Sequence, residues 1–497
     1  MTAPIEPAPP VATGDLAEFE EDLASPAVPA GRTPLVIKLL VAATFVVILN
    51  ETTLVNAVPR LMEDFRISET TAQWSLTVFM LTMAAVIPIT GWFLQRVSTR
   101  TAYATAMSTF VAGTLVAAVA PTFGVLLVGR VIQAGGTAVM MPLLMTTLMT
   151  VVATEDRGRV MGQVTLAMSC APALGPAVSG ILLHFGSWRL IFVVMLPIAV
   201  LVGLFGFRQL ENVGETTKSP VSWLSVVLAA GGFSTFVYGL SKVGNGAWTE
   251  PALLIGGGVV LVAAFALYQL RLQRSDTPLM DLRTLKHRNF AVSLVLMSAG
   301  FMAFLGSMLL LPLYFQNLRG LTELQTGLLV MPGGLAMGLL GPQVGKVYDR
   351  IGARPLVIPG SVVMVALLFA LSRIGAETPY ALLVVLHVAL MASLATVFTP
   401  VFTIGLGDLE PQLYSHGSSL LGTLQQVAGA IGTALLIVIM TNRSEHLAER
   451  GSSDGEAFMG GLQWAFAAGA TIGLVVVAMS LLLPPKADAP AGAHGGH

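Results

Sequence analysis

The chain has 497 residues, of which 55% are hydrophobic and only 11% are charged, and its mean hydropathy is +0.79. Because a soluble domain carries about 25% charged residues, a chain this apolar needs lipid as the solvent for much of its surface. Its net charge of −1 argues against a nucleic-acid partner, and its single cysteine, Cys170, excludes an internal disulfide.

The first segment, residues 1–34, is rich in Pro and Ala and carries an acidic run at 18–22. It lacks the basic-then-apolar layout of a signal peptide, so we expect a disordered cytoplasmic tail. The last segment, 484–497, has the same character and is expected to be a second tail. His494 and His497 lie in this second tail. Two histidines on a flexible tail can bind a metal, but more often they have no such role, so no metal site is predicted.

Fourteen apolar runs follow, each near the 20 residues that cross a bilayer as a helix. They predict an all-α integral membrane protein with both termini on one side. The expected spans are 36–58, 74–94, 102–120, 124–148, 159–183, 188–208, 222–241, 252–271, 290–315, 324–346, 355–373, 380–404, 419–441 and 461–483.

The distribution of basic residues predicts which side carries the termini. With the N-terminus in the cytoplasm, seventeen of the 26 Lys and Arg residues fall in cytoplasmic segments or span ends, and eight fall in outer ones. Only Arg130 is left inside a span. Since cytoplasmic loops carry an excess of Lys and Arg, both termini are expected in the cytoplasm.

In the first expected span, Glu51 is the only acidic residue well inside any predicted helix. The fourth span carries Arg130 at a similar depth, in the sequence Gly129-Arg-Val-Ile-Gln133. A charge inside a membrane is costly and usually faces a partner or a wet cavity. We therefore expect Glu51 and Arg130 to lie close together, either as a functional pair or as a structural lock between two helices.

The fifth expected span has an unusual pattern of small residues. Four of them recur every four positions: Ala167, Ala171, Gly175 and Ser179. This interval forms one narrow stripe on a helix, and small side chains allow two backbones to approach closely. Pro176 lacks a backbone donor and can bend the helix. Either a hinge or ordinary helix packing explains the pattern.

A sequence repeat relates the turn after the second span to a turn 254 residues later. Both contain Gly, Arg and Arg at the same offsets: Gly91, Arg96 and Arg100, then Gly345, Arg350 and Arg354. Such repeats are typical of secondary transporters. They predict a six-helix bundle over 35–208, a linker with two extra helices over 209–288, and a second six-helix bundle over 289–483.

These features make the chain resemble the major facilitator superfamily, specifically its fourteen-span drug:proton antiporters, over residues 36–483. The fifth span matches the offsets of the family's antiporter motif at Gly162, Ala171, Gly175, Pro176, Ser179 and Gly180, with Ala and Ser in place of two glycines. The first span is similar to the family's first-helix motif and looks like that of the lincosamide-resistance branch.

The resemblance implies export of amphipathic small molecules or drugs by alternating access, in exchange for protons. It implies that a proton gradient drives transport and that no cofactor is needed. It also implies a monomer in the cell membrane, whose partners are the substrate, protons and lipid. Proton coupling is expected at Glu51, Arg130 and Asn50, and conformational gating at five residues of the repeated turns: Arg96, Arg100, Asp349, Arg350 and Arg354.

Two departures from the family's pattern bear on these expectations. The family often has Asp where Asn50 stands, so the acid is displaced by one residue to Glu51. In the first repeated turn, Gln95 and Ser98 replace the common Asp and Gly, which Asp349 and Gly352 keep in the second. We therefore expect a weaker gating charge network in the first half.

Weaker candidates for a substrate cavity are Gln133, Gln425, Gln426 and Tyr314, with helix packing as the alternative. His387, inside the twelfth span, relays protons or is a hydrogen-bonded structural residue. For aromatic and methionine side chains there are also two expectations: they line a drug pocket, or they pack against other helices and face lipid. Examples are Trp74, Phe79, Met80, Met83 and Phe315.

Two other functions are alternatives to drug export. A metabolite exporter or importer can use the same scaffold, because fold does not fix substrate. A membrane-embedded enzyme is disfavoured, since no nucleophile–base set, metal cluster or phosphate-binding loop is visible in the sequence.

Overall fold

The computed structural model describes residues 33–213, 216, 220–243 and 248–485. The expected tails 1–34 and 484–497 therefore lie almost wholly outside the described residues, as do His494 and His497. Within the described part, fourteen helices are long and apolar enough to cross a membrane. This confirms the predicted all-α membrane fold.

The first seven membrane helices, with the short helices next to them, are α2 (Leu35–Thr53), η1 (Val55–Ala57) and α3 (Val58–Phe65), α4 (Glu69–Ala72) and α5 (Trp74–Arg96), α6 (Thr99–Ala118), α7 (Phe123–Val151), η2 (Thr154–Asp156) and α8 (Arg157–Phe185), α9 (Arg189–Gln209) and α10 (Trp223–Ser241). The second seven are α11 (Thr249–Leu272) with η3 (Gln273–Ser275), η4 (Leu282–Lys286) and α12 (Arg288–Leu313) with η5 (Tyr314–Leu318), α13 (Glu323–Ile351), α14 (Arg354–Leu371), α15 (Tyr380–Gly407), η6 (Pro411–Leu413) and α16 (Tyr414–Glu449), and α17 (Asp454–Ser480).

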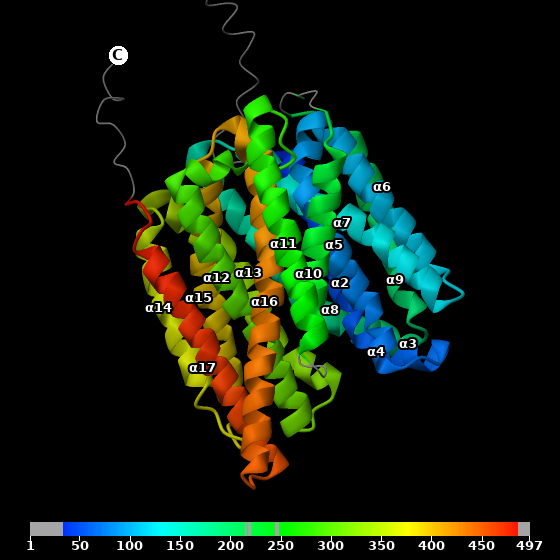
Figure 1. Cartoon of the computed structure of the whole chain (residues 1–497), viewed down its shortest axis with the longest axis vertical. Coiled ribbons are helices and arrows are strands. Elements are labelled where there is room, and N and C mark those ends of the chain that lie inside the picture. The colour runs from blue at the N-terminus through cyan, green and yellow to red at the C-terminus, as the bar shows by residue number, and fades with distance from the viewer. Residues whose placement is uncertain (1–32, 214–215, 217–219, 244–247, 486–497) are drawn as a thin grey trace, which may run out of the picture.

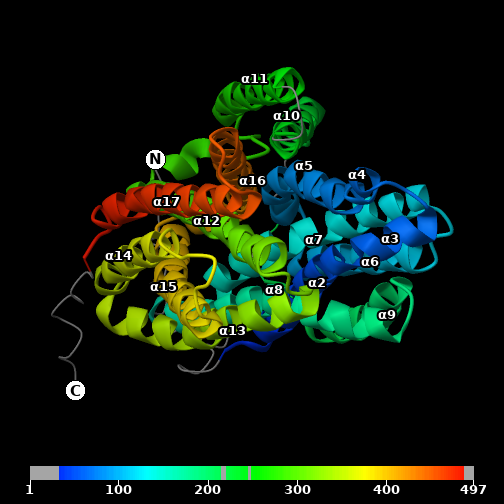
Figure 2. The same ribbon diagram turned by 90° about the horizontal axis from the view of Figure 1, so that it is seen from below.

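The helices form two six-helix bundles with one pair outside them. The first bundle contains α2 and α5–α9, and the second contains α12–α17 (Figure 1). In the view along the helices, α10 and α11 stand at one edge, beyond α5 and α16 (Figure 2). We call the end that carries Thr33 and Pro485 the tail end, and the opposite end the far end.

Capping side chains define several helix starts. Ser98 and Thr122 accept backbone hydrogen bonds at the starts of α6 and α7. Reciprocal side-chain and backbone bonds between Thr322 and Gln325 begin α13, and the Ser453–Glu456 pair does the same for α17. These bonds satisfy amides that have no partner inside the helix, so the chain can turn sharply between spans.

The largest difference from the predicted boundaries is in α16, which runs over Tyr414–Glu449 where the sequence predicts 419–441. Its polar end residues continue the helix beyond the apolar stretch. Hydropathy measures only the part that meets hydrocarbon, whereas a helix ends where its backbone bonds end.

Many large apolar side chains remain exposed, including Leu201 at 68% and Val260 at 67%. In water such a surface would be an aggregation hazard, but in a bilayer it faces lipid tails. The two bundles meet mainly along two helix pairs, α8 with α13 and α5 with α16. These two contacts flank the space in which the candidate site lies.

Candidate functional site

A cavity of about 650 Å³ lies between the two bundles. Its walls come from α2, α5, α7 and α8 of the first bundle and from α12, α13, α15 and α16 of the second. The lining reaches Val55, Gln316 and Glu323 near the far end and stops at Thr165 and Phe402 toward the tail end.

The cavity wall is mostly apolar and adaptable. Eight methionines line it: Met83, Met140, Met141, Met168, Met308, Met331, Met337 and Met391. Phe301, Phe304 and Phe398 form an aromatic cluster, in which the rings of Phe301 and Phe398 stack with centroids 4.9 Å apart. Flexible methionines and flat aromatic rings suit ligands of variable shape.

Glu51 and Glu323 are the two acidic residues in this wall, and no Lys or Arg is among the described residues that line it. Glu51 is half-buried, and its carboxylate makes no hydrogen bond or ion pair with any residue that the structure describes. The adjacent Asn50 is fully buried, and both polar atoms of its amide lack a partner among those residues. The cavity therefore carries a carboxylate with free hydrogen-bonding capacity.

Arg130 lies behind the cavity wall, not in it. Its guanidinium donates to the Ser75 carbonyl at 3.2 Å and to Gln133 Oε1 at 2.6 Å, and it lies 4.0 Å from the centre of the Phe79 ring. Arg130 is near enough to influence Glu51 through its charge, but no guanidinium nitrogen lies within 4.0 Å of a Glu51 carboxylate oxygen, so the two do not form an ion pair. The Ser75 and Phe79 contacts hold Arg130 on the α5 side, which explains why no direct pair forms.

The candidate hinge on α8 packs closely against α2. A Cβ at Gly175 would overlap Thr52 of α2, and the Asn56 amide donates to the Pro176 carbonyl at 3.1 Å. Gly175, one residue of the stripe, thus faces the helix that carries Glu51. Any movement of α8 at Pro176 is therefore coupled sterically to the position of α2.

The opposite face of α8 packs on α13 along most of its length. Gly158 and Gly162 meet the backbone at Gly345 and Gly341, leaving no room for a side chain on either helix. At the tail end, Asp349 accepts hydrogen bonds from the backbone amides of Gly158 and Arg159, both at 2.8 Å. A carboxylate at a helix N-terminus is favoured by both the free amides and the helix dipole.

The α5–α16 contact also closes the tail end, but with neutral groups. Gln95 donates its amide to the Gln412 carbonyl at 2.8 Å, and Ser419 donates to the Ile87 carbonyl at 2.6 Å. Deeper in the molecule, the hydroxyls of Thr165 and Thr399 meet at 2.9 Å where the cavity lining ends toward the tail end. Together with Asp349, these bonds seal the cavity from the tail end.

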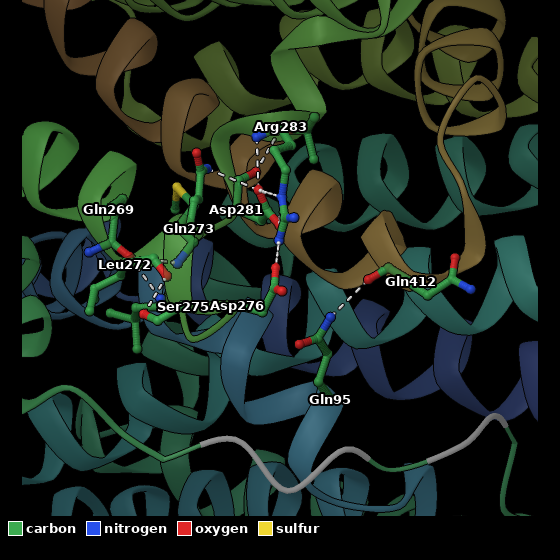
Figure 3. A network of polar contacts seen from close by, with 12 residues as sticks. Gln95, Gln269, Leu272, Gln273, Ser275, Asp276, Asp281, Arg283 and Gln412 are labelled. Carbon is green, nitrogen blue, oxygen red and sulfur yellow. Dashed lines mark hydrogen bonds and ion pairs between the residues drawn. The ribbon is translucent and has the colours of Figure 1, made fainter.

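A network of polar side chains from the linker between α11 and α12 lies beside the Gln95–Gln412 bond (Figure 3). Asp281 binds Arg283 and the Gln273 amide, and Arg283 also pairs with Asp276 at 2.9 Å. Gln269 of α11 accepts hydrogen bonds from the Leu279 and Met280 amides, which fixes the linker to the extra helix pair.

The remaining predicted residues lie in different places. Gln425 and Gln426 line the cavity, whereas Gln133 is buried beneath Arg130, and Tyr314 donates to the Gly375 carbonyl outside the cavity. Gly180 lies at the far end of α8, where a Cβ would meet only Leu324.

The arginines of the repeated turns have separate surroundings. Arg96 lies over the Trp92 ring and Arg100 over Phe207, and Arg354 donates to carbonyls at the end of α17. Arg350 also interacts with other residues. All these arginines lie at the tail end.

Sequence reasoning did not single out the aromatic cluster or the glycine face of α13, and it used Gly345 only as part of the repeated turn. Those glycines, Gly334, Gly338, Gly341 and Gly345, lie three or four positions apart. This spacing puts them on one helix face and was a readable signal. The three phenylalanines carry no such signal, because their meeting depends on how α12 and α15 cross.

A cavity between two helical bundles, closed at one end of the membrane by interhelical bonds, defines a membrane transporter of the two-bundle type. The family profile described as "Major Facilitator Superfamily" matches residues 40–433. The "Lincomycin resistance protein LmrB" of Listeria monocytogenes is 38% identical over 457 residues, covering 90% of this chain and 95% of the relative.

The "Multidrug resistance protein B homolog" of Mycobacterium tuberculosis is 30% identical over 389 residues, covering 77% of this chain and 72% of the relative. The crystal structure of the human organic anion transporter MFSD10 has the same fold, with a TM-score of 0.62 at 15% identity over 90% of this chain and all of that one. The chain belongs to the major facilitator superfamily and is a multi-pass membrane transporter of that family.

Proposed function

We propose that this transporter is a proton-coupled antiporter that exports amphipathic small molecules by alternating access. The observation that carries the proposal is the cavity between the bundles, which combines an apolar, methionine-rich wall with a Glu51 carboxylate that no described residue binds. The names of the lincomycin and multidrug resistance relatives support export of drugs.

The charge of the wall favours amphipathic substrates that carry a basic amine. Glu51 and Glu323 give the cavity negative charge, and no Lys or Arg is among its described lining residues. An ammonium group would gain from a carboxylate in such a site, while the methionines and Phe398 would cover the apolar part of the molecule. This composition supports a drug exporter over a transporter of polar metabolites.

Glu51 is the proposed site of proton coupling, with Arg130 and Asn50 as its neighbours. The proton affinity of a buried carboxylate depends on its solvation and on its distance from a cation. Arg130 is held by α5 and α7 contacts, whereas Glu51 is carried by α2, which packs on the hinge at Gly175. Movement of α2 would change the Glu51–Arg130 distance and thereby release or bind a proton.

In the proposed cycle, the two bundles, 35–208 and 289–483, rock against each other around the cavity, with bending at Gly175 and Pro176. The proposed orientation has the tail end in the cytoplasm, which the excess of basic residues there supports. The contacts at Gln95 and Asp349 then close the cytoplasmic side. We propose that the protein acts as a monomer in the cell membrane, without a cofactor.

The test is proton-driven efflux in proteoliposomes with an imposed pH gradient. Glu51→Gln removes the titratable group with little change in shape, so gradient-driven efflux should fall at least about tenfold while substrate binding stays measurable. Arg130→Ala should impair coupling as well. Asn50→Asp combined with Glu51→Gln returns an acid to the neighbouring position and should restore part of the efflux.

The control is Glu323→Gln, which removes the other cavity carboxylate at the far end and should leave coupling to the gradient intact. Efflux by Glu51→Gln at the wild-type rate would contradict Glu51 as the coupling residue. If wild-type efflux does not respond to the pH gradient, the antiport mechanism itself is wrong.

A further inference from the structure

Four residues of the cavity wall have a buried polar side-chain atom that no described residue binds, namely Thr44, Thr326, His387 and Gln425, and the last two are the histidine and the amide among them. His387 of α15 is 3% exposed, and its Nε2 lies 3.2 Å from the Val330 carbonyl of α13. A carbonyl only accepts, so Nε2 must carry the proton. In the neutral ring Nδ1 is then an acceptor, and this atom is buried without a partner.

Gln425 of α16 offers the complementary group. Its side-chain nitrogen is buried and has no partner among the described residues, while the residue itself lines the cavity. A buried polar atom without a bond costs stability, on the order of 1–3 kcal/mol. Two such atoms in the wall of one cavity are costly unless a ligand supplies their partners.

We propose that His387 and Gln425 determine substrate specificity by direct hydrogen bonds: His387 Nδ1 accepts from a donor on the substrate, and the Gln425 amide donates to an acceptor. This assignment rests on the proposed function and deepens it. The substrate class is an amphipathic amine that also carries hydroxyl or amide groups. Glu51 lines the same cavity and would face the amine.

Geometry separates the two roles that His387 can have. His387→Gln places an amide nitrogen near the former Nε2, which keeps the bond to Val330 but removes the acceptor at Nδ1. His387→Asn places an amide oxygen near the former Nδ1, which keeps the acceptor but loses the bond to Val330. A structural histidine needs the first contact, and a substrate-binding histidine needs the second.

The experiment measures equilibrium binding of two radiolabelled probes to the full chain in nanodiscs. Lincomycin carries an amine, an amide and hydroxyl groups, whereas tetraphenylphosphonium is an apolar cation with no hydrogen-bonding group. We expect His387→Gln to weaken lincomycin binding about tenfold and to leave tetraphenylphosphonium binding unchanged, since a buried donor loses its partner. His387→Asn should bind both probes within about twofold of wild type.

Gln425→Met gives an independent arm, because it keeps the length of the side chain and removes its donor. It should weaken lincomycin binding about tenfold, again without effect on tetraphenylphosphonium. The matched control is Gln426→Met in the same wall, whose amide is not sealed from solvent. Water can replace its lost bonds, so a change below about threefold is expected.

Three results would overturn the assignment. An equal loss of both probes in His387→Gln would indicate a collapsed cavity, and retention of lincomycin by His387→Gln with loss in His387→Asn would indicate a structural histidine. Equal effects of Gln425→Met and Gln426→Met would remove Gln425 from the site. If the wild-type protein binds neither probe, the proposed export of amphipathic amines fails, and this assignment fails with it.

Discussion

The two contacts that close the tail end occupy equivalent places in the two halves but are built differently. In the α8–α13 contact, Asp349 binds two backbone amides, and glycines bring the helices into backbone contact. In the α5–α16 contact, the equivalent residue is Gln95, which donates to a single carbonyl. The charged one of these two contacts is therefore the one that α13 makes.

The difference indicates how the closed state divides its stability. Hydrogen bonds to a charged group contribute more than neutral ones, about 1.5–3 against 0.5–1.5 kcal/mol. If α8 and α13 separate, all the glycine contacts between their backbones are lost together. The α5–α16 contact instead has the linker network of Asp281 and Arg283 beside it. We expect the first contact to dominate closure and the second to be adjustable.

The largest expected effect comes from Gly162→Leu, which forces α8 away from the Gly341 backbone. Overpacking of this kind costs about 1–3 kcal/mol, so the closed state should lose roughly 5–150-fold in population. A cysteine at Ser169, in a Cys170→Ala background, reports opening through its reaction with an impermeant thiol reagent added from the tail end.

Gly180→Leu is the matched control, because it lies on the same helix and meets only the Leu324 side chain. Its labelling rate should stay within about twofold of the background protein. Equal rates for the two variants would show that the glycine contact does not govern closure.

A smaller effect is expected from Asp349→Asn, which removes the charge and keeps an acceptor oxygen for only one of the Gly158 and Arg159 amides. The loss of charge assistance should cost about 1 kcal/mol and raise tail-end labelling roughly fivefold. Gln95→Ala is the comparison and should raise it less than threefold. A larger effect from Gln95→Ala would reverse the proposed order of the two contacts.

The smallest effect is expected from Arg283→Met, which breaks the ion pairs with Asp276 and Asp281 but keeps the length of the side chain. The Arg283–Asp276 pair is partly exposed and contributes less than about 1 kcal/mol, and the buried Asp281 carboxylate keeps hydrogen bonds from the Gln273 amide and the backbone N–H at position 283. Labelling should rise by less than threefold, and the rise should shrink as salt is added. A salt-independent rise would indicate a packing effect of the substitution.

A good part of this architecture was predictable from the sequence. Apolar runs must lie in lipid, so fourteen spans follow from hydropathy without knowledge of the contacts. The repeated turns at Gly91 and Gly345 predicted two related halves. Glu51 and Arg130 were recognisable because a charge inside a span is costly wherever it is placed.

Only the tertiary structure decided which side chains meet. Arg130 and Glu51 lie at similar depth, yet the Ser75 carbonyl and the Phe79 ring hold the guanidinium away from an ion pair. The cavity is assembled from eight helices, so no single segment encodes its aromatic cluster. Only the structure shows that His387 and Gln425 each have a buried polar atom that no described residue binds. Hydropathy fixes the depth of a residue in the membrane, whereas helix rotation and crossing set its neighbours, and those depend on packing across the whole molecule.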